Sequence, residues 1–236
     1  MKDDKNFSVI VNALQRLGIE TKANINECDF SSLAEELTQI ADDSDNKNYE
    51  KRFKLSRMHS ATYFRDYIDK KDRGMDPDML KSLLNLSFME KRENIVFWGN
   101  PGTGKSWLAQ MIATSACQAN KRVRWVDFQP LYRELEHLKL TSVSRFESRL
   151  NYYSKFDLLC IDEFLNYSVE DSYILQEFFK RIDDIGKCTL IICCQSDPAI
   201  WNKLFNINSF GESVRGRILH RSKLINALGE DLRLCK

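Results

Sequence analysis

The chain has 236 residues, of which 43% are hydrophobic and 29% are charged, and its formal net charge at pH 7 is +1. This length is enough for one large hydrophobic core and a smaller accessory part, and the composition is typical of a soluble globular protein. The nearly balanced charge excludes a globally basic surface, so any binding of nucleic acid depends on local patches.

The cysteines, the histidines and the start of the chain limit the function classes further. The seven cysteines include no C-x-x-C pair, and the three histidines lack the spacing of metal ligands. Residues 1–5 lack the apolar core of a secretion signal, and no later apolar run approaches the length of a membrane span. We therefore expect a reduced, cytoplasmic protein without a structural metal centre and without a membrane partner.

Residues 1–60 are predicted to form a small helical domain that binds DNA or a protein partner. Apolar residues at helical spacing predict a first helix that ends at Gly18. Residues 41–48 are acidic and polar, which favours a hinge, and a charged helix is expected over residues 51–67.

The remaining residues, 61–236, are predicted to form an α/β domain. Asp76 and Pro77 offer a helix N-cap with proline at the first helical position, ahead of a helix that extends to Met89. After residue 94, strand and helix patterns alternate, which implies a parallel sheet flanked by helices. The expected strands are residues 95–98, 123–126, 158–161 and 190–193; the expected helices are two or three within 130–154, one over 172–185, and most of the tail over 201–236.

Residues 99–106 have the sequence Gly-Asn-Pro-Gly-Thr-Gly-Lys-Ser, a complete phosphate-loop motif between a predicted strand and a predicted helix. Its glycines let the backbone turn tightly, so that successive N–H groups face a phosphate at the positive end of the helix. Lys105 can reach the β- and γ-phosphates, and the Ser106 hydroxyl can ligate Mg²⁺. A turn without a ligand is the alternative, but the strand–loop–helix context favours a site for ATP and Mg²⁺. The residues expected to contact the nucleotide are Gly99, Asn100, Pro101, Gly102, Thr103, Gly104, Lys105, Ser106 and Trp107.

A second motif follows the apolar run of residues 158–161, where the chain continues with Asp162 and Glu163. This position is the carboxyl edge of the predicted sheet, where ligands bind in open α/β folds. We expect Asp162 to hold Mg²⁺, directly or through water, and Glu163 to polarise the attacking water in phosphoryl transfer. The alternative is a strand that ends in two surface acids, which the preceding phosphate loop disfavours.

Two acidic residues in this order distinguish an NTPase of the AAA+ type from kinases and small GTPases. The chain resembles the IstB-type ATPases, which are helpers of bacterial insertion-sequence transposases and relatives of the DnaC-type helicase loaders. The resemblance implies an AAA+ core that hydrolyses ATP with Mg²⁺. It covers residues 90–236 and is weak before them, where it rests on Glu50, Arg52, Arg57 and the region of Ala61. The matching segments are residues 90–106, 157–163, 194–195 with Trp201, 217–220 and 229–233.

The resemblance also assigns roles to three further residues. Gln195 falls at the sensor-1 position, a polar side chain at a strand end that faces the γ-phosphate. Arg217 matches the arginine finger that reaches the ATP of a neighbouring subunit, and Arg233 matches the sensor-2 arginine that contacts phosphate in its own subunit. For each arginine, a solvated helix face is the alternative.

The chain departs from the family pattern at three places. Ser106-Trp107 stands where the family usually has Thr-His, which keeps a hydroxyl available for Mg²⁺. Gly216 replaces the acid that commonly precedes the finger arginine, so Arg215 is a competing candidate for that role. The last segment, residues 229–233, is a loose match to the family's ending.

Two basic patches are the candidate contacts with DNA, and for either of them a solvated helix face is the alternative. The first lies after the second predicted strand, where the resemblance places inserted helices that face a central channel. The second lies in the N-terminal helices. Aromatic residues are sparse in both, so we expect contacts with the DNA backbone that depend little on base sequence. The first patch is Lys139, Arg145 and Arg149; the second is Lys51, Arg52, Lys54 and Arg57.

Three functions remain open from the sequence. The first is a transposition helper, an ATP-dependent oligomer that assembles on duplex DNA and recruits a transposase. The second is a DnaC-like loader that binds a replicative helicase and single-stranded DNA. The third is a switch in which ATP controls an interaction surface without DNA. Cys194-Gln195 favours the helper, because that family often has Ser-Gln where loaders more often have Ser-Asn.

Overall fold

The computed structural model describes residues 2–18, 31–68, 76–166, 169, 171–205, 209–227, 229 and 231. The chain divides into two compact units, Met1–Arg52 and Phe53–Lys236. Each unit has its own buried apolar side chains, among them Ile10 in the first and Phe97 in the second. In the described part of the chain, no helix is both long and apolar enough to cross a membrane.

The first unit contains α1 (Lys2–Arg16) and most of α2 (Ser31–Ser56). The Arg16 guanidinium binds the carboxylates of Asp42 (2.5 Å) and Asp45 (2.7 Å), which lie three residues apart and therefore on one face of α2. The hinge predicted over residues 41–48 is wrong, because α2 is continuous there. The acidic run has a cationic partner on α1, and Ala41 is fully buried, so tertiary contacts hold this stretch in a helix.

Short helices follow at the start of the second unit. Arg57 has φ 60°, which a right-handed helix does not allow, so the charged helix predicted over residues 51–67 is interrupted. The predicted N-cap at Asp76 is confirmed, because its carboxylate accepts a hydrogen bond from the Asp78 N–H (3.0 Å). Leu86, at φ 61°, divides the helix that was expected to reach Met89. The three helices are α3 (Phe64–Ile68), α4 (Pro77–Leu84) and α5 (Ser87–Glu90).

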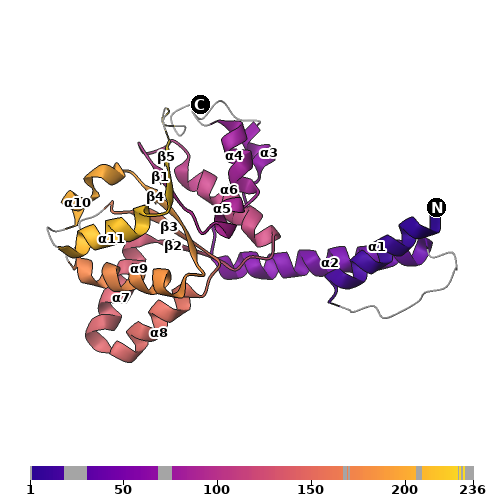
Figure 1. Ribbon diagram of the computed structural model, residues 1–236, viewed down its shortest axis with the longest axis horizontal. Coiled ribbons are helices and arrows are strands. Elements are labelled where there is room, and N and C mark those ends of the chain that lie inside the picture. Colours follow the sequence, from indigo (N-terminus) through magenta and orange to yellow (C-terminus); the bar gives the residue numbers. More distant parts are fainter. Residues whose placement is uncertain are drawn as a thin grey trace. The chain divides into compact units, whose positions relative to one another are not determined.

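The second unit is built on a five-stranded sheet with the strand order β2-β3-β4-β1-β5 (Figure 1). All neighbouring strands are parallel, which confirms the predicted α/β architecture. The strands are β1 (Asn94–Trp98), β2 (Val123–Asp127), β3 (Leu158–Phe164), β4 (Thr189–Cys194) and β5 (Ser222–Asn226).

The fifth strand is an addition to the elements predicted from the sequence, which favours a mostly helical tail. The tail does contain α10 (Trp201–Leu204) and α11 (Ser209–Leu219), but β5 follows them. Its burial pattern carries little signal, because Lys223 and Leu224 are exposed and only Ile225 is buried. The strand forms because β1 offers an open edge, with which β5 pairs in register.

Helices cover both faces of this sheet (Figure 1). One face carries α6 (Lys105–Gln118), with α4 packed against it; the other carries α7 (Phe128–Thr141), α8 (Val143–Ser154), α9 (Ser172–Ile185) and α11. The helix predicted over residues 172–185 is confirmed, and it ends at Gly186, which has φ 62°. Between the second and third strands, where the sequence predicts two or three helices, the structure has two, α7 and α8.

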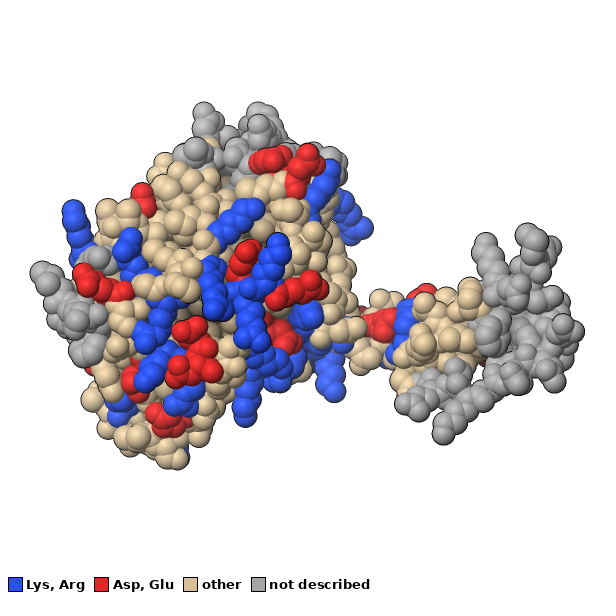
Figure 2. Space-filling view, in the orientation of Figure 1, with Lys and Arg blue, Asp and Glu red and all other residues tan. Residues whose placement is uncertain are grey.

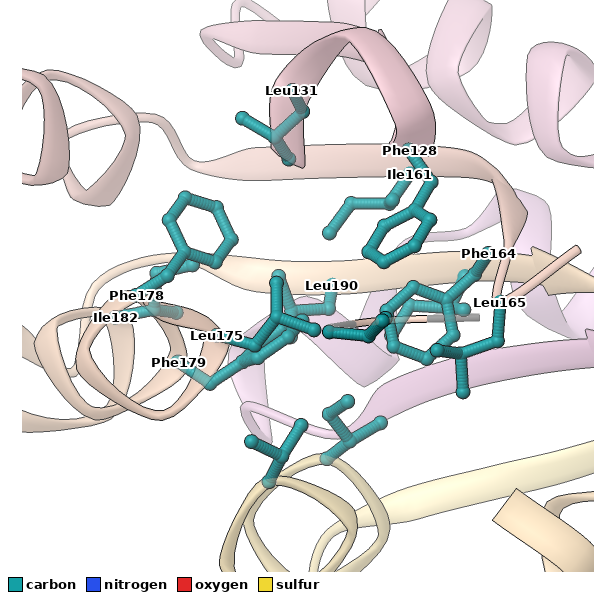
Figure 3. Packing of buried hydrophobic residues seen from close by; sticks show 14 of the residues in the cluster. Phe128, Leu131, Ile161, Phe164, Leu165, Leu175, Phe178, Phe179, Ile182 and Leu190 are labelled. Atoms are coloured by element: carbon teal, nitrogen blue, oxygen red, sulfur yellow. The ribbon is translucent and has the colours of Figure 1, made fainter. Parts of the chain in front are cut away.

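A hydrophobic core lies between α9 and the sheet (Figure 3). Leu175, Phe178, Phe179 and Ile182 project from α9 at helical spacing, and all are buried. At the end of β3, the Phe164 ring contacts the rings of Phe128 (4.8 Å) and Trp201 (5.0 Å between centroids). This aromatic cluster anchors the carboxyl end of β3, where the acidic motif lies.

Candidate functional site

The phosphate-loop residues connect β1 to α6 in a backbone conformation that requires glycine. Gly99 has φ 135° and Gly102 has φ 79°, and side chains rarely adopt such values. Space excludes a side chain as well. A Cβ on Gly99 would lie 2.6 Å from the Ala227 carbonyl oxygen, and one on Gly102 would lie 1.8 Å from Asp231 Oδ1. The glycines of the loop are therefore in close contact with Ala227 and Asp231, which follow β5 in the sequence.

The Lys105 ammonium lies inside this loop. The residue is only 8% exposed, and its Nζ donates hydrogen bonds to the carbonyl oxygens of Gly99 (2.8 Å) and Asn100 (2.6 Å). A buried ammonium needs such partners, because an uncompensated buried charge is very costly. Phosphate oxygens are stronger acceptors for an ammonium than neutral carbonyls, so this charge is suited to bind a polyphosphate.

Ser106 and Asp162 come together from different elements. Ser106 is in the first turn of α6, and its Oγ donates to Asp162 Oδ1 on β3 (2.9 Å). Burial raises the pKa of the Asp162 carboxyl, and the hydrogen bond from Ser106 opposes this shift. A hydroxyl beside a desolvated carboxylate forms a set of hard oxygen donors, which suits Mg²⁺. The residues present therefore fit the metal that the sequence predicts.

Glu163 directly follows Asp162, and a local irregularity of β3 at this point gives the two side chains different surroundings. Glu163 has φ 54°, and the pairing with β4 shifts register between Ile161 and Phe164. Its N–H donates to Asp162 Oδ1 (2.9 Å), while the Glu163 side chain is exposed. One carboxylate is thus directed toward the loop and the other toward solvent, which allows two different roles.

The strand order brings Gln195 to the same edge of the sheet. Strand β4 lies between β1 and β3, so Gln195, which follows β4, lies between the phosphate loop and the acidic motif. Its side chain is exposed. Burial raises the pKa of the preceding thiol, Cys194, to about 12, so that thiol stays neutral near pH 7.

The two finger candidates lie on α11. Arg215 donates from Nε to the Pro198 carbonyl (3.1 Å). Arg217 donates to the Ser213 hydroxyl. It also lines a cavity with Asn94, the first residue of β1, and Leu190, the second residue of β4. Arg217 therefore lies toward the amino edge of the sheet, away from its own phosphate loop. Arg233 lies outside the described residues.

The basic residues of the first patch differ in their surroundings. Arg149 forms an ion pair with Glu134 (2.8 Å), and the Lys139 ammonium lies over the rings of Phe146 and Tyr173 (4.8 Å each). Arg145 is exposed at the start of α8. Of the second patch, Lys51, Arg52 and Lys54 lie in α2, and Arg57 lies in the turn after it.

Sequence reasoning missed two contacts of the phosphate loop. Asp231 lies against Gly102, and Ala227 lies against Gly99. Ala227 follows β5, and its N–H donates to the Trp98 carbonyl (2.8 Å). The only signal in the sequence is the glycine content of the loop, which indicates a close approach without naming the partner.

Comparisons with known proteins identify the family of the chain. The family described as IstB-like ATP binding protein matches residues 6–236. The ATP-binding protein of insertion sequence IS232 from Bacillus thuringiensis subsp. berliner is 29% identical over 175 residues, which cover 72% of this chain and 69% of that protein. The corresponding protein of insertion sequence IS21 from Pseudomonas aeruginosa is 27% identical over 216 residues, 90% of this chain and 79% of that protein.

Solved structures share the fold. AMPPCP-bound DnaA from Aquifex aeolicus superposes with a TM-score of 0.56 at 20% identity; the match covers 72% of this chain and half of that longer one. The DnaC helicase loader superposes with a TM-score of 0.53 at 19% identity, over 64% of this chain and 88% of that chain. At such identities the likeness concerns the fold alone, and it confirms the predicted AAA+ phosphate-loop core.

Proposed function

Because the chain belongs to the family of IstB-like ATP binding proteins, we propose that it is a Mg²⁺-dependent ATPase that assembles on duplex DNA and recruits a transposase. The observation that carries the ATPase is the hydrogen bond between Ser106 and Asp162 (2.9 Å) beside the buried Lys105 ammonium. This arrangement combines a cation for the phosphates with oxygen donors for a divalent metal.

In the proposed reaction, the loop N–H groups and Lys105 bind the phosphates, and Lys105 exchanges its carbonyl partners for phosphate oxygens. Ser106 and Asp162 would hold Mg²⁺, which neutralises the charge that develops on the transferred phosphoryl group. Glu163 accepts a hydrogen bond from the attacking water and orients it. Gln195 donates to the γ-phosphate, and Arg233 contacts phosphate in the same subunit.

Two variants test this assignment. Lys105→Ala should abolish binding of a fluorescent ATP analogue, because the loop loses its point charge. Glu163→Gln should bind the analogue normally and hydrolyse ATP at least about 100-fold more slowly, because the water loses its orienting group. Glu90→Gln, which changes an exposed carboxylate on α5, is the matched control. Hydrolysis near the wild-type rate by Glu163→Gln would remove Glu163 from this role.

We also propose that ATP drives self-association, since Arg217 lies away from the phosphate loop of its own subunit. Arg217→Ala should lose hydrolysis and keep its affinity for ATP. Arg215 donates to the Pro198 carbonyl and Arg217 donates to the Ser213 hydroxyl, so hydrogen bonding within the subunit does not separate the two candidates. If Arg217→Ala is fully active and Arg215→Ala is inactive, the finger is Arg215.

Binding of DNA is the next part of the proposal. Basic and acidic side chains are interspersed on the face of the second unit in Figure 2, so the acidic side chains partly offset the positive charge of a single subunit there. An oligomer repeats each small patch, and phosphate contacts then add across subunits, with a steep dependence on salt. Arg145 is the exposed member of the first patch, so it should contribute most to the affinity for DNA, and Lys139 and Arg149 should contribute less.

Titration of labelled duplex and single strands with ATP, with ADP and without nucleotide tests this part. We expect ATP-dependent binding of duplex that weakens as the salt concentration rises. Arg145→Ala should bind duplex more weakly than the control variant Lys155→Ala, which removes an exposed cation at the other end of α8. Residues 1–60, with Lys51, Arg52, Lys54 and Arg57, are the proposed second contact with DNA or the partner. A preference for single strands would favour a helicase loader instead, and no binding in any state would exclude both DNA functions.

A further inference from the structure

The cavity that Arg217 lines with Asn94 and Leu190 has a volume of about 620 Å³ and lies at the amino edge of the sheet. This volume is within the range of ligand-binding pockets. Asn94 holds the surrounding elements together: its Oδ1 accepts from the Leu190 N–H of β4 (2.9 Å), and its Nδ2 donates to the Ile218 carbonyl of α11 (3.3 Å). The cavity is therefore a fixed part of the fold, formed by the starts of β1 and β4 and the ends of α9 and α11.

Three arginines line this cavity, and they come from separate segments. Arg92 lies in the turn before β1, Arg217 in the last turn of α11, and Arg221 just before β5. The lining also contains one carboxylate, Asp183. Within the described ranges, no ion pair joins any of the three arginines to a carboxylate. The cavity therefore carries an excess of positive charge and is suited to an anion with several charges.

Arg92 lies beside the end of α9. A Cβ on Gly186, the C-cap of that helix, would lie 3.1 Å from Arg92 Nη1, so the guanidinium rests against the helix terminus. The carbonyl end of a helix carries partial negative charge and stabilises a nearby cation. The guanidinium therefore lies near the partial negative charge of this helix end.

The cavity cannot serve the ATP of its own subunit. The phosphate loop follows the carboxyl end of β1, whereas Arg92 precedes the amino end, and the strand has five residues. At about 3.3 Å per residue the two edges are separated by about 16 Å. In a head-to-tail assembly, by contrast, each subunit presents one surface to a different surface of the next. The arginines can then meet a nucleotide that another copy holds.

We propose that this cavity receives the triphosphate of ATP bound to a second copy of the chain, and that Arg92 and Arg221 bind its phosphates together with Arg217. This inference rests on the proposed ATPase and its self-association. It extends the contact in trans from one finger residue to three arginines, two of which lie outside α11. The bidentate geometry of guanidinium groups suits phosphate oxygens, and their positive charge complements a triphosphate with bound Mg²⁺.

Single variants give the first test. Arg92→Ala and Arg221→Ala should each lower the rate of ATP hydrolysis by about tenfold or more, while the affinity for an ATP analogue in the unassembled subunit stays within about twofold. Lys121→Ala is the matched control, because this exposed cation lies just before β2, at the same sheet edge but outside the cavity lining. Thermal unfolding of each variant shows whether the fold is retained.

Mixing variants distinguishes action in trans from a structural role. Arg92→Ala has an intact phosphate loop, and Lys105→Ala has an intact cavity, so a mixture should hydrolyse ATP faster than the sum of the two alone. A mixture of Arg92→Ala with the double variant Arg92→Ala/Lys105→Ala lacks any intact cavity and should show no gain.

The results of these experiments decide whether the cavity acts on the ATP of a second copy. A mixture without a gain, or an Arg92→Ala protein with the wild-type rate, overturns the inference and leaves the proposed ATPase in place. Weaker binding of DNA by Arg92→Ala with unchanged hydrolysis would assign the cavity to DNA phosphates instead. A wild-type protein that neither hydrolyses ATP nor associates would remove the proposed function and this inference together.

Discussion

Replacing Ser106 by alanine removes the hydroxyl that donates to Asp162 Oδ1 across 2.9 Å. A hydrogen bond to an ionised group contributes about 1.5–3 kcal/mol to stability. In a domain of the size of the second unit, each kcal/mol shifts the midpoint of thermal unfolding by about 2–4 °C. We therefore expect Ser106→Ala to lower this midpoint by about 3–12 °C in the nucleotide-free protein at pH 7.

The loss should depend on pH, because it depends on the charge of Asp162. Burial raises the pKa of this carboxyl, and the Ser106 hydroxyl lowers it again. The stabilisation by Ser106 is therefore present while Asp162 is ionised, and it declines as the pH falls through the raised pKa of the folded state. Unfolding measured by circular dichroism from pH 7 downward should show wild type and Ser106→Ala converging.

A double-mutant cycle isolates the interaction. Combining Ser106→Ala with Asp162→Asn should give a coupling free energy of about 1 kcal/mol or more, since the asparagine keeps the shape and removes the charge. Ser115→Ala is the control on the same helix, because its hydroxyl bonds only to the Met111 carbonyl (3.2 Å), and it should change stability by less than about 0.5 kcal/mol. A coupling below about 0.5 kcal/mol, or equal losses for both serine variants, would refute the reasoning.

Three further predictions concern the loop, the core and a buried phenol. Gly102→Ala should destabilise the protein by about 1–2 kcal/mol, because φ is 79° and the new Cβ would lie 1.8 Å from Asp231 Oδ1; Asp231→Ala should relieve part of this loss, and an equal loss in both backgrounds would contradict the contact. Trp201→Ala should lower the free energy of unfolding by about 3–5 kcal/mol, since the ring is fully buried against Phe164; a denaturant titration that shows less than about 1 kcal/mol would argue against this packing. Burial beside Glu134 raises the pKa of Tyr153 to about 12, so stability should fall as the pH rises above about 10, where the unfolded tyrosine ionises; the fall should be smaller in Tyr153→Phe, and identical pH profiles would exclude this phenol as the cause.

Several elements of the fold and the site could be predicted because their signals are local. The phosphate loop is defined by the identity and order of residues 99–106, and the structure places it between β1 and α6 as expected. Helix α9 has four apolar residues at helical spacing and a glycine cap, so its bounds follow from periodicity. The acidic motif also follows from local order, because an apolar run that ends in two acids predicts a buried strand that ends at the sheet edge.

Other elements depend on partners that are distant in the sequence. The stretch over residues 41–48 has the composition of a hinge, yet it is helical because Arg16 pairs with Asp42 and Asp45 and because Ala41 is buried. Strand β5 has one buried side chain and depends on the open edge of β1 for its hydrogen bonds. Neither partner can be identified from a local pattern.

The sequence by itself determined the candidate residues of the carboxyl edge, because the glycines, Lys105, Ser106, Asp162 and Glu163 are specified by residue type and spacing. Only the tertiary structure decided what surrounds them. Strand order places Gln195 between the loop and the acids, and the tertiary fold brings Asp231 against Gly102. It also gathers Arg92, Arg217 and Arg221 around one cavity, although 125 residues separate Arg92 from Arg217. The physical reason is that packing and strand pairing join residues by position in space, and no local periodicity records those contacts.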